Sequence, residues 1–193
     1  ALEAAAIAAI NAGNATLQNY TATGITDVND DNLDAVNTAV AEARTTKGSN
    51  LTKAEIQSEV DGVLAAIAAI NASNATLQDY EAAGITGVND DNLDDVNTAV
   101  ADAISTKRAD LTKAEIQSEV DGVLAAWAAA ALEETAIAAI NTGNATLQNY
   151  TDAGITGVTK DNLGAVNAGV AAIKATKGSD LTKEDIQNVV NNF

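Results

Sequence analysis

The sequence contains no cysteine, histidine, proline or methionine, and only five of its 193 residues are aromatic. Without cysteine or histidine the chain has no thiolate nucleophile, no imidazole base, and no zinc-finger or disulfide framework. Positive charge is also scarce, because 10 lysines and arginines oppose 27 aspartates and glutamates, which gives a formal net charge of −17. So acidic a chain disfavours nucleic acid and anionic membrane surfaces as partners.

Long apolar runs are missing as well. The longest one, residues 123–132, is far shorter than the roughly 20 residues that a transmembrane helix needs, so we expect no membrane insertion. No signal peptide is recognisable. The chain begins at Ala1 rather than at a methionine, and we expect it to be a fragment or a processed form. Hydrophobic residues make up 47% of the chain, but many are alanine, which predicts a thin core.

The chain repeats itself. Residues 51–60 recur unchanged as residues 111–120, a period of 60, and a drifted copy follows at residues 181–190 after a further 70. The ten additional residues lie at about 127–136. Repeats of this length indicate tandem structural units. The predicted units are residues 1–60 (repeat 1), 61–130 (repeat 2, with the inserted segment) and 131–193 (repeat 3).

Each repeat is predicted to be helical. Thr52 and Glu55 have the spacing of a capping box, and Leu51 and Ile56 that of a hydrophobic staple. The same device recurs at residues 111–116 and 181–186. Apolar residues then follow at intervals of three and four from 56 to 70, which is typical of one uninterrupted amphipathic helix.

A short and a medium helix complete each repeat. In repeat 2 the short helix is expected to begin after Thr76 and to end at Gly84, and the medium helix to run from the polar cluster 89–92 to about Lys107. Three such helices predict an all-α fold of tandem small three-helix bundles. Because the long helix crosses the repeat boundary, we expect it to be shared by two bundles and to join them into a semi-rigid rod.

Three segments of repeat 2, residues 80–86, 91–97 and 111–124, carry a resemblance to a known family. Their pattern resembles the albumin-binding-like helical modules (GA-like modules) of bacterial surface proteins, and it is closest to the Ala/Asn/Thr/Asp-rich tandem modules of very large secreted adhesins. The resemblance covers the whole chain in three copies. It implies three-helix modules, an extracellular location at the bacterial cell surface, and a stalk or adhesive role.

A calcium-binding loop is the strongest candidate for a chemical site in the sequence. Asp27, Asn29 and Asp31 alternate as in the first half of an EF-hand, but Asn32 and Thr38 occupy the positions that require glycine and glutamate. We therefore favour a cluster that caps a helix N-terminus and predict no metal site.

Paired carboxylates are the other chemical candidates, at positions 94–95, 133–134 and 184–185. Their helical phase exposes them, whereas a catalytic carboxylate needs burial or a close like charge to shift its pKa. We expect no enzyme activity, no catalytic residue, no cofactor and no small-molecule substrate.

Four aromatic residues are possible protein-contact residues. Tyr20, Tyr80 and Tyr150 recur at one place in each repeat, either as a repeated binding spot or as half-buried rings with their hydroxyls in water. Trp127 lies in the insertion and has no counterpart, so it either packs at a repeat junction or anchors a contact between chains. Residues 1–3 match residues 131–133, so the insertion is either native or the mark of an artificial junction.

These features predict a non-catalytic structural protein, a spacer or stalk segment of a bacterial extracellular adhesin or surface protein. The alternative is a binding module that captures a host protein or a neighbouring chain, including a copy of itself, through a helical face. In both cases the possible partner is a protein, either a host protein or another copy of this chain.

Overall fold

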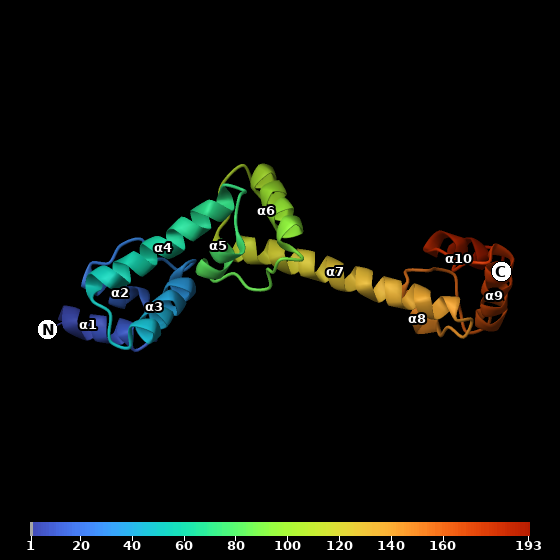
Figure 1. The fold of residues 1–193 in the computed structure, drawn as a ribbon, viewed down its shortest axis with the longest axis horizontal. Helices are drawn as coiled ribbons and strands as arrows, with labels where there is room; N and C mark the ends of the chain where they lie inside the picture. Colours follow the sequence, from blue (N-terminus) through green and yellow to red (C-terminus); the bar gives the residue numbers. More distant parts are fainter. Residues whose placement is uncertain (1) are drawn as a thin grey trace. The chain divides into compact units, whose positions relative to one another are not determined.

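The computed structural model describes residues 2–193 and folds them into α-helices without a strand (Figure 1). This confirms the all-α prediction. The helices are α1 (Leu2–Asn11), α2 (Leu17–Thr23), α3 (Leu33–Lys47), α4 (Lys53–Asn71), α5 (Leu77–Ala82), α6 (Leu93–Lys107), α7 (Lys113–Asn141), α8 (Leu147–Asp152), α9 (Leu163–Lys177) and α10 (Lys183–Val190).

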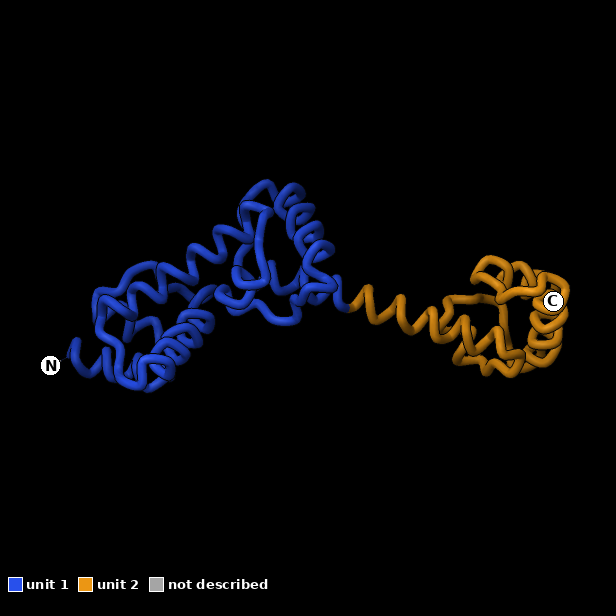
Figure 2. Tube along the Cα trace, in the orientation of Figure 1, with its two compact units in different colours: residues 1–124 blue, residues 125–193 orange. Residues whose placement is uncertain are grey.

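The chain forms two compact units, residues 1–124 and residues 125–193 (Figure 2). Unit 1 contains two hydrophobic cores, one in each of the first two repeats, and unit 2 contains the core of repeat 3. The chain therefore has two compact units but three hydrophobic cores, one in each predicted repeat. The three-repeat boundaries themselves remain a prediction.

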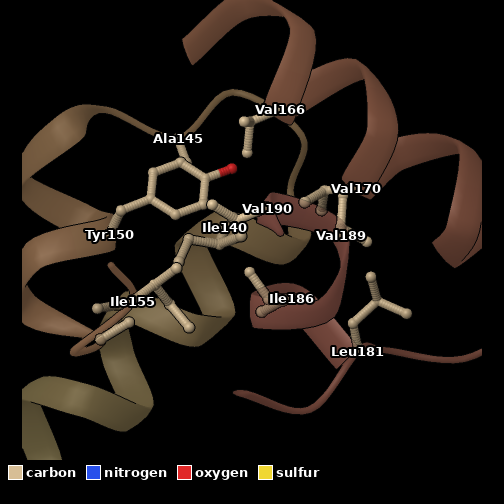
Figure 3. Packing of buried hydrophobic residues seen from close by; sticks show 12 residues of the cluster. Ile140, Ala145, Tyr150, Ile155, Val166, Val170, Leu181, Ile186, Val189 and Val190 are labelled. Carbon is tan, nitrogen blue, oxygen red and sulfur yellow. The ribbon is translucent and has the colours of Figure 1, made fainter. Parts of the chain in front are cut away.

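The core of unit 2 shows how little apolar volume each repeat uses. Ile140 of α7, Tyr150 of α8 and Ile186 of α10 meet inside it (Figure 3) and are 0–1% exposed. Val166 and Val170 of α9 complete the centre. Valine, isoleucine and alanine supply nearly all the other buried side chains, so the tyrosine ring is the largest single contribution to the core.

Within unit 1, helix α4 serves two cores. Ile56 and Val60 are buried in the core of repeat 1, and Ala66 and Ile70 are buried in the core of repeat 2. Ile67 packs against both. The helix is therefore unbroken between two hydrophobic clusters, as its continuous apolar stripe predicts.

Helix ends follow the sequence signals closely. The Oγ1 of Thr52 accepts a hydrogen bond from the amide of Glu55 at 3.3 Å, and the Glu55 carboxylate accepts one from the amide of Thr52 at 2.7 Å. The boxes predicted at Thr112 and Thr182 are also present. Gly84 ends the short helix with a φ of 64°, and the amide of Ile85 donates to the carbonyl of Tyr80 at 2.8 Å, which is a Schellman arrangement.

Helix α7 contains the insertion and remains helical through it. Residues 128–131 are all exposed. Glu133 pairs with Lys183 at 2.7 Å, and the matching residues of repeat 1, Glu3 and Lys53, approach to 3.6 Å. The end of the insertion therefore acts as the beginning of repeat 3, whether or not the junction is native.

Among the described residues, α7 is the helix that is long and apolar enough to cross a membrane, by length and composition only. This differs from the sequence-based expectation, which considered uninterrupted apolar runs. Only 11% of its apolar window is buried, and the charged residues Glu133 and Glu134 lie within the apolar part of the helix. Because a carboxylate in the bilayer centre is costly, the absence of membrane insertion remains our prediction.

Candidate functional site

The three tyrosines proposed as contact residues lie inside the cores. Tyr20, Tyr80 and Tyr150 are each 1% exposed. The hydroxyl of Tyr20 donates to Oδ1 of Asn37 at 2.7 Å, and Nδ2 of Asn37 donates to the carbonyl of Ala15 at 3.0 Å. Repeats 2 and 3 have the same chain of hydrogen bonds.

The interpretation of half-buried rings with water-exposed hydroxyls is therefore wrong. The medium helix provides an asparagine whose side-chain oxygen accepts a hydrogen bond from the phenol hydroxyl, so the ring can enter the core without an unsatisfied hydroxyl. Burial raises the pKa of Tyr20 and of Tyr80 to about 12, with a smaller contribution from Asp79 for the latter. A partner would have to open a bundle to reach these rings, and their contact role stays a prediction.

Trp127 differs from the tyrosines because its side chain is exposed. It lies on α7 with 40% of its surface accessible, and Leu132 on the same helix is 50% accessible. The hypothesis of a protein contact through an aromatic residue therefore depends on Trp127. Packing at a junction and contact between chains both remain predictions for this residue.

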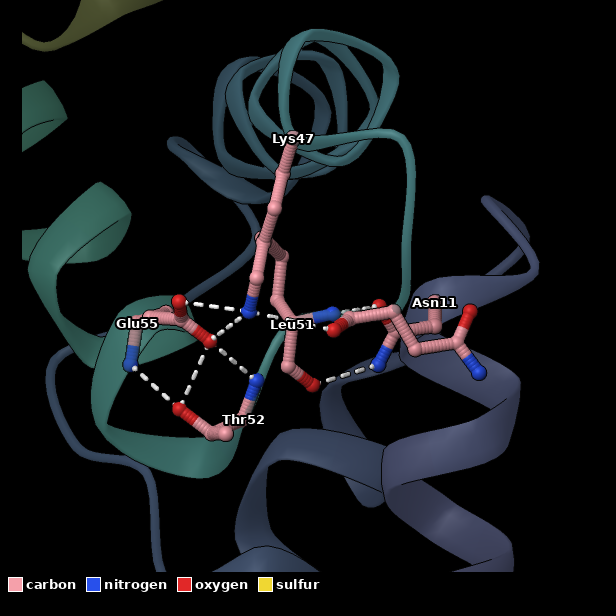
Figure 4. Close-up of polar contacts among 6 residues, drawn as sticks. Asn11, Lys47, Leu51, Thr52 and Glu55 are labelled. Carbon is pink, nitrogen blue, oxygen red and sulfur yellow. Dashed lines mark hydrogen bonds and ion pairs between the residues drawn. The ribbon is translucent and has the colours of Figure 1, made fainter.

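The sequence did not predict the role of the asparagine that ends α1, α4 and α7, which is buried at Asn11 and Asn141 and partly buried at Asn71. Nδ2 of Asn11 donates to the carbonyl of Leu51 at 3.0 Å, and the amide of Leu51 donates to Oδ1 of Asn11 at 2.7 Å (Figure 4). Asn71 and Asn141 hold Leu111 and Leu181 in the same way. The signal was an asparagine repeated 40 residues before each leucine, which local helix rules do not interpret.

An ion pair lies beside this asparagine clamp. Nζ of Lys47, the last residue of α3, lies 2.6 Å from the carboxylate of Glu55, which also receives the amide of Thr52 (Figure 4). The Lys47 hydrogen bond first, and then those from Thr52, lower the pKa of Glu55 to about 2. Lys107–Glu115 and Lys177–Asp185 repeat the arrangement. These carboxylates are engaged in joining two helices.

The loop considered for calcium uses its side-chain oxygens to organise its own backbone. Oδ1 of Asn29 accepts from the amides of Asp31 and Asn32 at 2.9 and 3.2 Å, and Nδ2 of Asn32 donates to the carbonyl of Asp27 at 2.8 Å. This is the geometry of a turn that leads into α3. In residues 2–193 no group of three or more acidic residues is placed to hold a metal ion.

Two of the surface clefts are further candidates. One lies between repeats 1 and 2 in unit 1, has a volume of about 480 Å³, and contains Glu42, Glu81 and Asp90 in its lining. The other is a groove of about 390 Å³ between α9 and α10, where Ile173 and Phe193 contribute apolar surface. Ile173 is 47% and Phe193 60% exposed. Both clefts are open surfaces, suited to contact with a macromolecule rather than to enclosing a substrate.

Comparisons with known proteins identified no relative of this chain. No family model, no curated protein and no solved structure matches the chain. The resemblance to GA-like modules therefore remains a hypothesis that depends on the residues quoted for it.

Proposed function

We propose that the chain is a non-catalytic spacer or stalk segment of a bacterial extracellular surface protein. The observation that carries the proposal is the threefold recurrence of one internal framework, which consists of a capping box, an asparagine clamp and a tyrosine–asparagine pair. Repetition of the internal framework with variation at the surface favours a mechanical role over a single active site.

Helix sharing supports the spacer role. Helix α4 contributes buried residues to two successive cores, so bending between repeats 1 and 2 would require disruption of a packed helix. An array built in this way would hold its ends apart without a flexible linker. The semi-rigid rod and the location at the cell surface both belong to this proposal.

Deletion of residues 127–136 tests the rod. An α-helix rises 1.5 Å per residue, so a straight α7 should lose about 15 Å. Small-angle scattering should therefore give a maximum dimension shorter by roughly that amount, with circular dichroism unchanged per residue. An equal maximum dimension would show that the insertion does not extend the particle.

The function itself is tested by changing the number of repeats between a cell-surface anchor and a known adhesive domain. If the chain is a spacer, the distance over which cells attach should increase with the number of repeats. A Gly/Ser linker of equal residue number is the matched control, because its end-to-end distance grows only with the square root of its length. An attachment distance that does not change with the number of repeats would contradict the proposal.

The exposed Trp127 favours a second candidate, a module that captures a host protein or a neighbouring chain through a helical face. Large apolar residues exposed on one helix are typical of contact sites. Immobilised chain should then retain a serum protein at micromolar affinity, and Trp127→Ala should weaken that binding at least tenfold. Retention that is equal for both forms would place the contact elsewhere.

A further inference from the structure

The asparagine clamp joins the helix that enters each repeat to the helix that leaves it. In repeat 2 the entering helix is α4, which ends at Asn71, and the leaving helix is α7, which begins two residues after Leu111. The two hydrogen bonds of the clamp, 3.0 and 2.7 Å long, join Asn71 directly to Leu111, 40 residues further along the chain. The chain between them therefore forms a loop whose two ends are held together by the clamp.

Both sides of the clamp are fixed to the structure around them. Nδ2 of Asn71 also donates to the carbonyl of Ile67, one turn earlier in α4, at 3.1 Å. The same bond to the carbonyl one turn back recurs in the other two repeats, at Asn11 and Asn141. On the other side, Leu111 is 5% exposed and belongs to the core of repeat 2. A pull on the entering helix therefore reaches the leaving helix through these hydrogen bonds.

The rest of each repeat lies inside the loop that the clamp closes. In repeat 2 this loop contains α5 and α6, and with them the hydrogen bond of 2.8 Å from the hydroxyl of Tyr80 to Oδ1 of Asn97. Nδ2 of Asn97 in turn donates to the carbonyl of Ala75 at 3.0 Å. All three residues belong to the segment 72–110, so these bonds stabilise the interior of the loop without joining α4 to α7. Tension along the chain bypasses them while the clamp is closed.

The clamp is also the stiffest link between the entering and the leaving helix. Ile70 of α4 and Ile116 of α7 belong to the same core, but apolar contact is non-directional, so such side chains can shift while they stay covered. A hydrogen bond weakens steeply once its atoms leave a narrow range of distance and angle. Because the two bonds share one asparagine side chain, they are lost together, and opening of the repeat has a threshold.

We propose that the asparagine clamp is a tension-sensitive latch, which transmits a pulling force between successive long helices and, when it breaks, releases the enclosed loop as additional length. The inference rests on the proposed function in one respect, that a spacer transmits tension. An extended chain spans at most about 3.3–3.6 Å per residue, so the release of 40 residues adds roughly 130–140 Å per repeat. A closed repeat is then a semi-rigid spacer, and an opened repeat is a longer, flexible tether.

The clamp has more support in repeat 3 than in repeat 2. In repeat 3, Nζ of Lys174 donates to the backbone carbonyl of Asn141 at 2.7 Å, which fixes the end of α7 to α9. A second tie is the ion pair of 2.7 Å between Glu133 of α7 and Lys183 of α10. The residues of repeat 2 that match Lys174 and Glu133 are Ile104 and Val63. Neither has a polar side chain, so repeat 2 should open at a lower force than repeat 3.

Stretching of single molecules of the full chain, held by their two ends at constant force, tests the proposal. Each opening should add roughly 130–140 Å of contour length, because the long helices outside the loop stay folded. A ten-residue Gly/Ser insertion after Arg108, at an exposed position of repeat 2, should lengthen one step by about 35 Å and thereby identify it. The same insertion after Gly178 marks repeat 3. Steps near 200 Å would mean that a repeat of about 60 residues unfolds as a whole, and would overturn the proposal.

Two matched variants separate the latch from general stability. Asn71→Ala and Asn97→Ala each remove an asparagine that bonds inside repeat 2, so both should lower its stability in urea. Asn71→Ala removes the clamp and should make repeat 2 open roughly ten times faster at a fixed force. Asn97→Ala weakens an interior that is still intact when the clamp breaks, and should leave the opening rate within about twofold. Circular dichroism checks that each variant is folded, and equal acceleration by both variants would overturn the latch.

The latch and the spacer function fail in different measurements. Pulling on isolated molecules involves no cell, so it reports on the clamp whether or not the chain acts as a spacer. If attachment distance follows the number of repeats but Asn71→Ala opens no faster than Asn97→Ala, the spacer function stands and the latch is wrong. If Asn71→Ala alone opens faster while attachment distance is independent of the number of repeats, the latch stands and the spacer function is wrong.

Discussion

At the scale of single residues, the repeats show which positions tolerate a substitution and at what cost. The second residue after α1, α4 and α7 adopts a left-handed conformation, with φ of 85° at Gly13, 62° at Ser73 and 86° at Gly143. A side chain in this region is strained by the contact of its Cβ with the backbone, which costs roughly 1–2 kcal/mol. Arg108 accepts the same strain with a φ of 58° where the other repeats have Gly48 and Gly178.

Ser73→Gly should therefore stabilise the chain. Relief of the left-handed strain exceeds the added entropy of the unfolded glycine, and we expect a gain of about 0.5–1 kcal/mol in the free energy of unfolding. Urea denaturation followed by circular dichroism measures it. The reverse change at the matching position, Gly143→Ser, should lose a similar amount, and a stabilised Gly143→Ser would contradict the explanation.

Loss of a clamp asparagine should cost more. Asn11→Ala leaves both the amide and the carbonyl of Leu51 without their side-chain partner in a buried place. An unsatisfied buried group costs about 1–3 kcal/mol, so we expect repeat 1 to be destabilised by about 2–3 kcal/mol. Hydrogen exchange of α3 and α4 amides reports on this repeat. Asn14→Ala, an exposed asparagine after α1, is the control, and equal effects of the two changes would argue against the clamp.

At the scale of elements, each medium helix is tied to the next long helix by one carboxylate. Each carboxylate accepts two kinds of hydrogen bond: one from a lysine in the last turn of the preceding helix, and one from the backbone amide of the threonine at the start of its own helix. The three carboxylates are those of Glu55, Glu115 and Asp185. The pair of helices is thus joined at its loop by charge as well as by the buried leucine. All three carboxylates are partly exposed to solvent, so their individual contributions to stability are modest.

Acid should loosen these helix pairs. The pKa of Glu55 falls from an ordinary 4.5 to about 2 on folding, because the folded state favours the ionised form. Such a group stabilises the folded state above pH 4.5, and this stabilisation is lost as the pH falls toward 2. Thermal unfolding measured across this range should show a falling melting temperature. Glu55→Gln should show a smaller fall, and an identical pH profile for the two forms would contradict the assignment.

At the scale of the whole molecule, negative charge is unevenly distributed. Repeat 2 has 12 acidic and 3 basic residues, whereas repeat 3 has 7 and 4. Net charges of −9 and −3 follow, with −5 for repeat 1. Self-repulsion should therefore be strongest in repeat 2, and the least acidic repeat is the one whose α9 face is free of carboxylates.

Salt should stabilise the folded chain by screening this repulsion. We expect the melting temperature to rise from low to moderate sodium chloride, and magnesium or calcium at equal ionic strength to give no additional rise. Differential scanning calorimetry in each salt, with and without a chelator, measures this. A sharp loss of stability on chelation at constant ionic strength would restore the calcium hypothesis for the loop before α3.

Local signals predicted the helices because the interactions that set helix ends act within a few residues. The Thr52–Glu55 box, the glycine stops and the apolar stripe of α4 could all be identified in this way. Distant pairings could not, because their partners are 17 to 40 residues apart: Tyr20 with Asn37, and Asn11 with Leu51. Burial of the tyrosines was misjudged for this reason, since a local pattern does not show where a hydroxyl finds its acceptor.

By itself, the sequence determined the helical composition, the period and the position of the insertion, because these depend on propensity and on the spacing of apolar residues along one chain. The tertiary structure decided which polar groups could be buried and which copies of a repeated surface are covered. Ala35 and Ala165 occupy matching positions in two repeats, yet Ala35 is buried against Gly84 and Ala165 is exposed to solvent. Only the packing of neighbouring repeats distinguishes them, because burial depends on what lies across the contact.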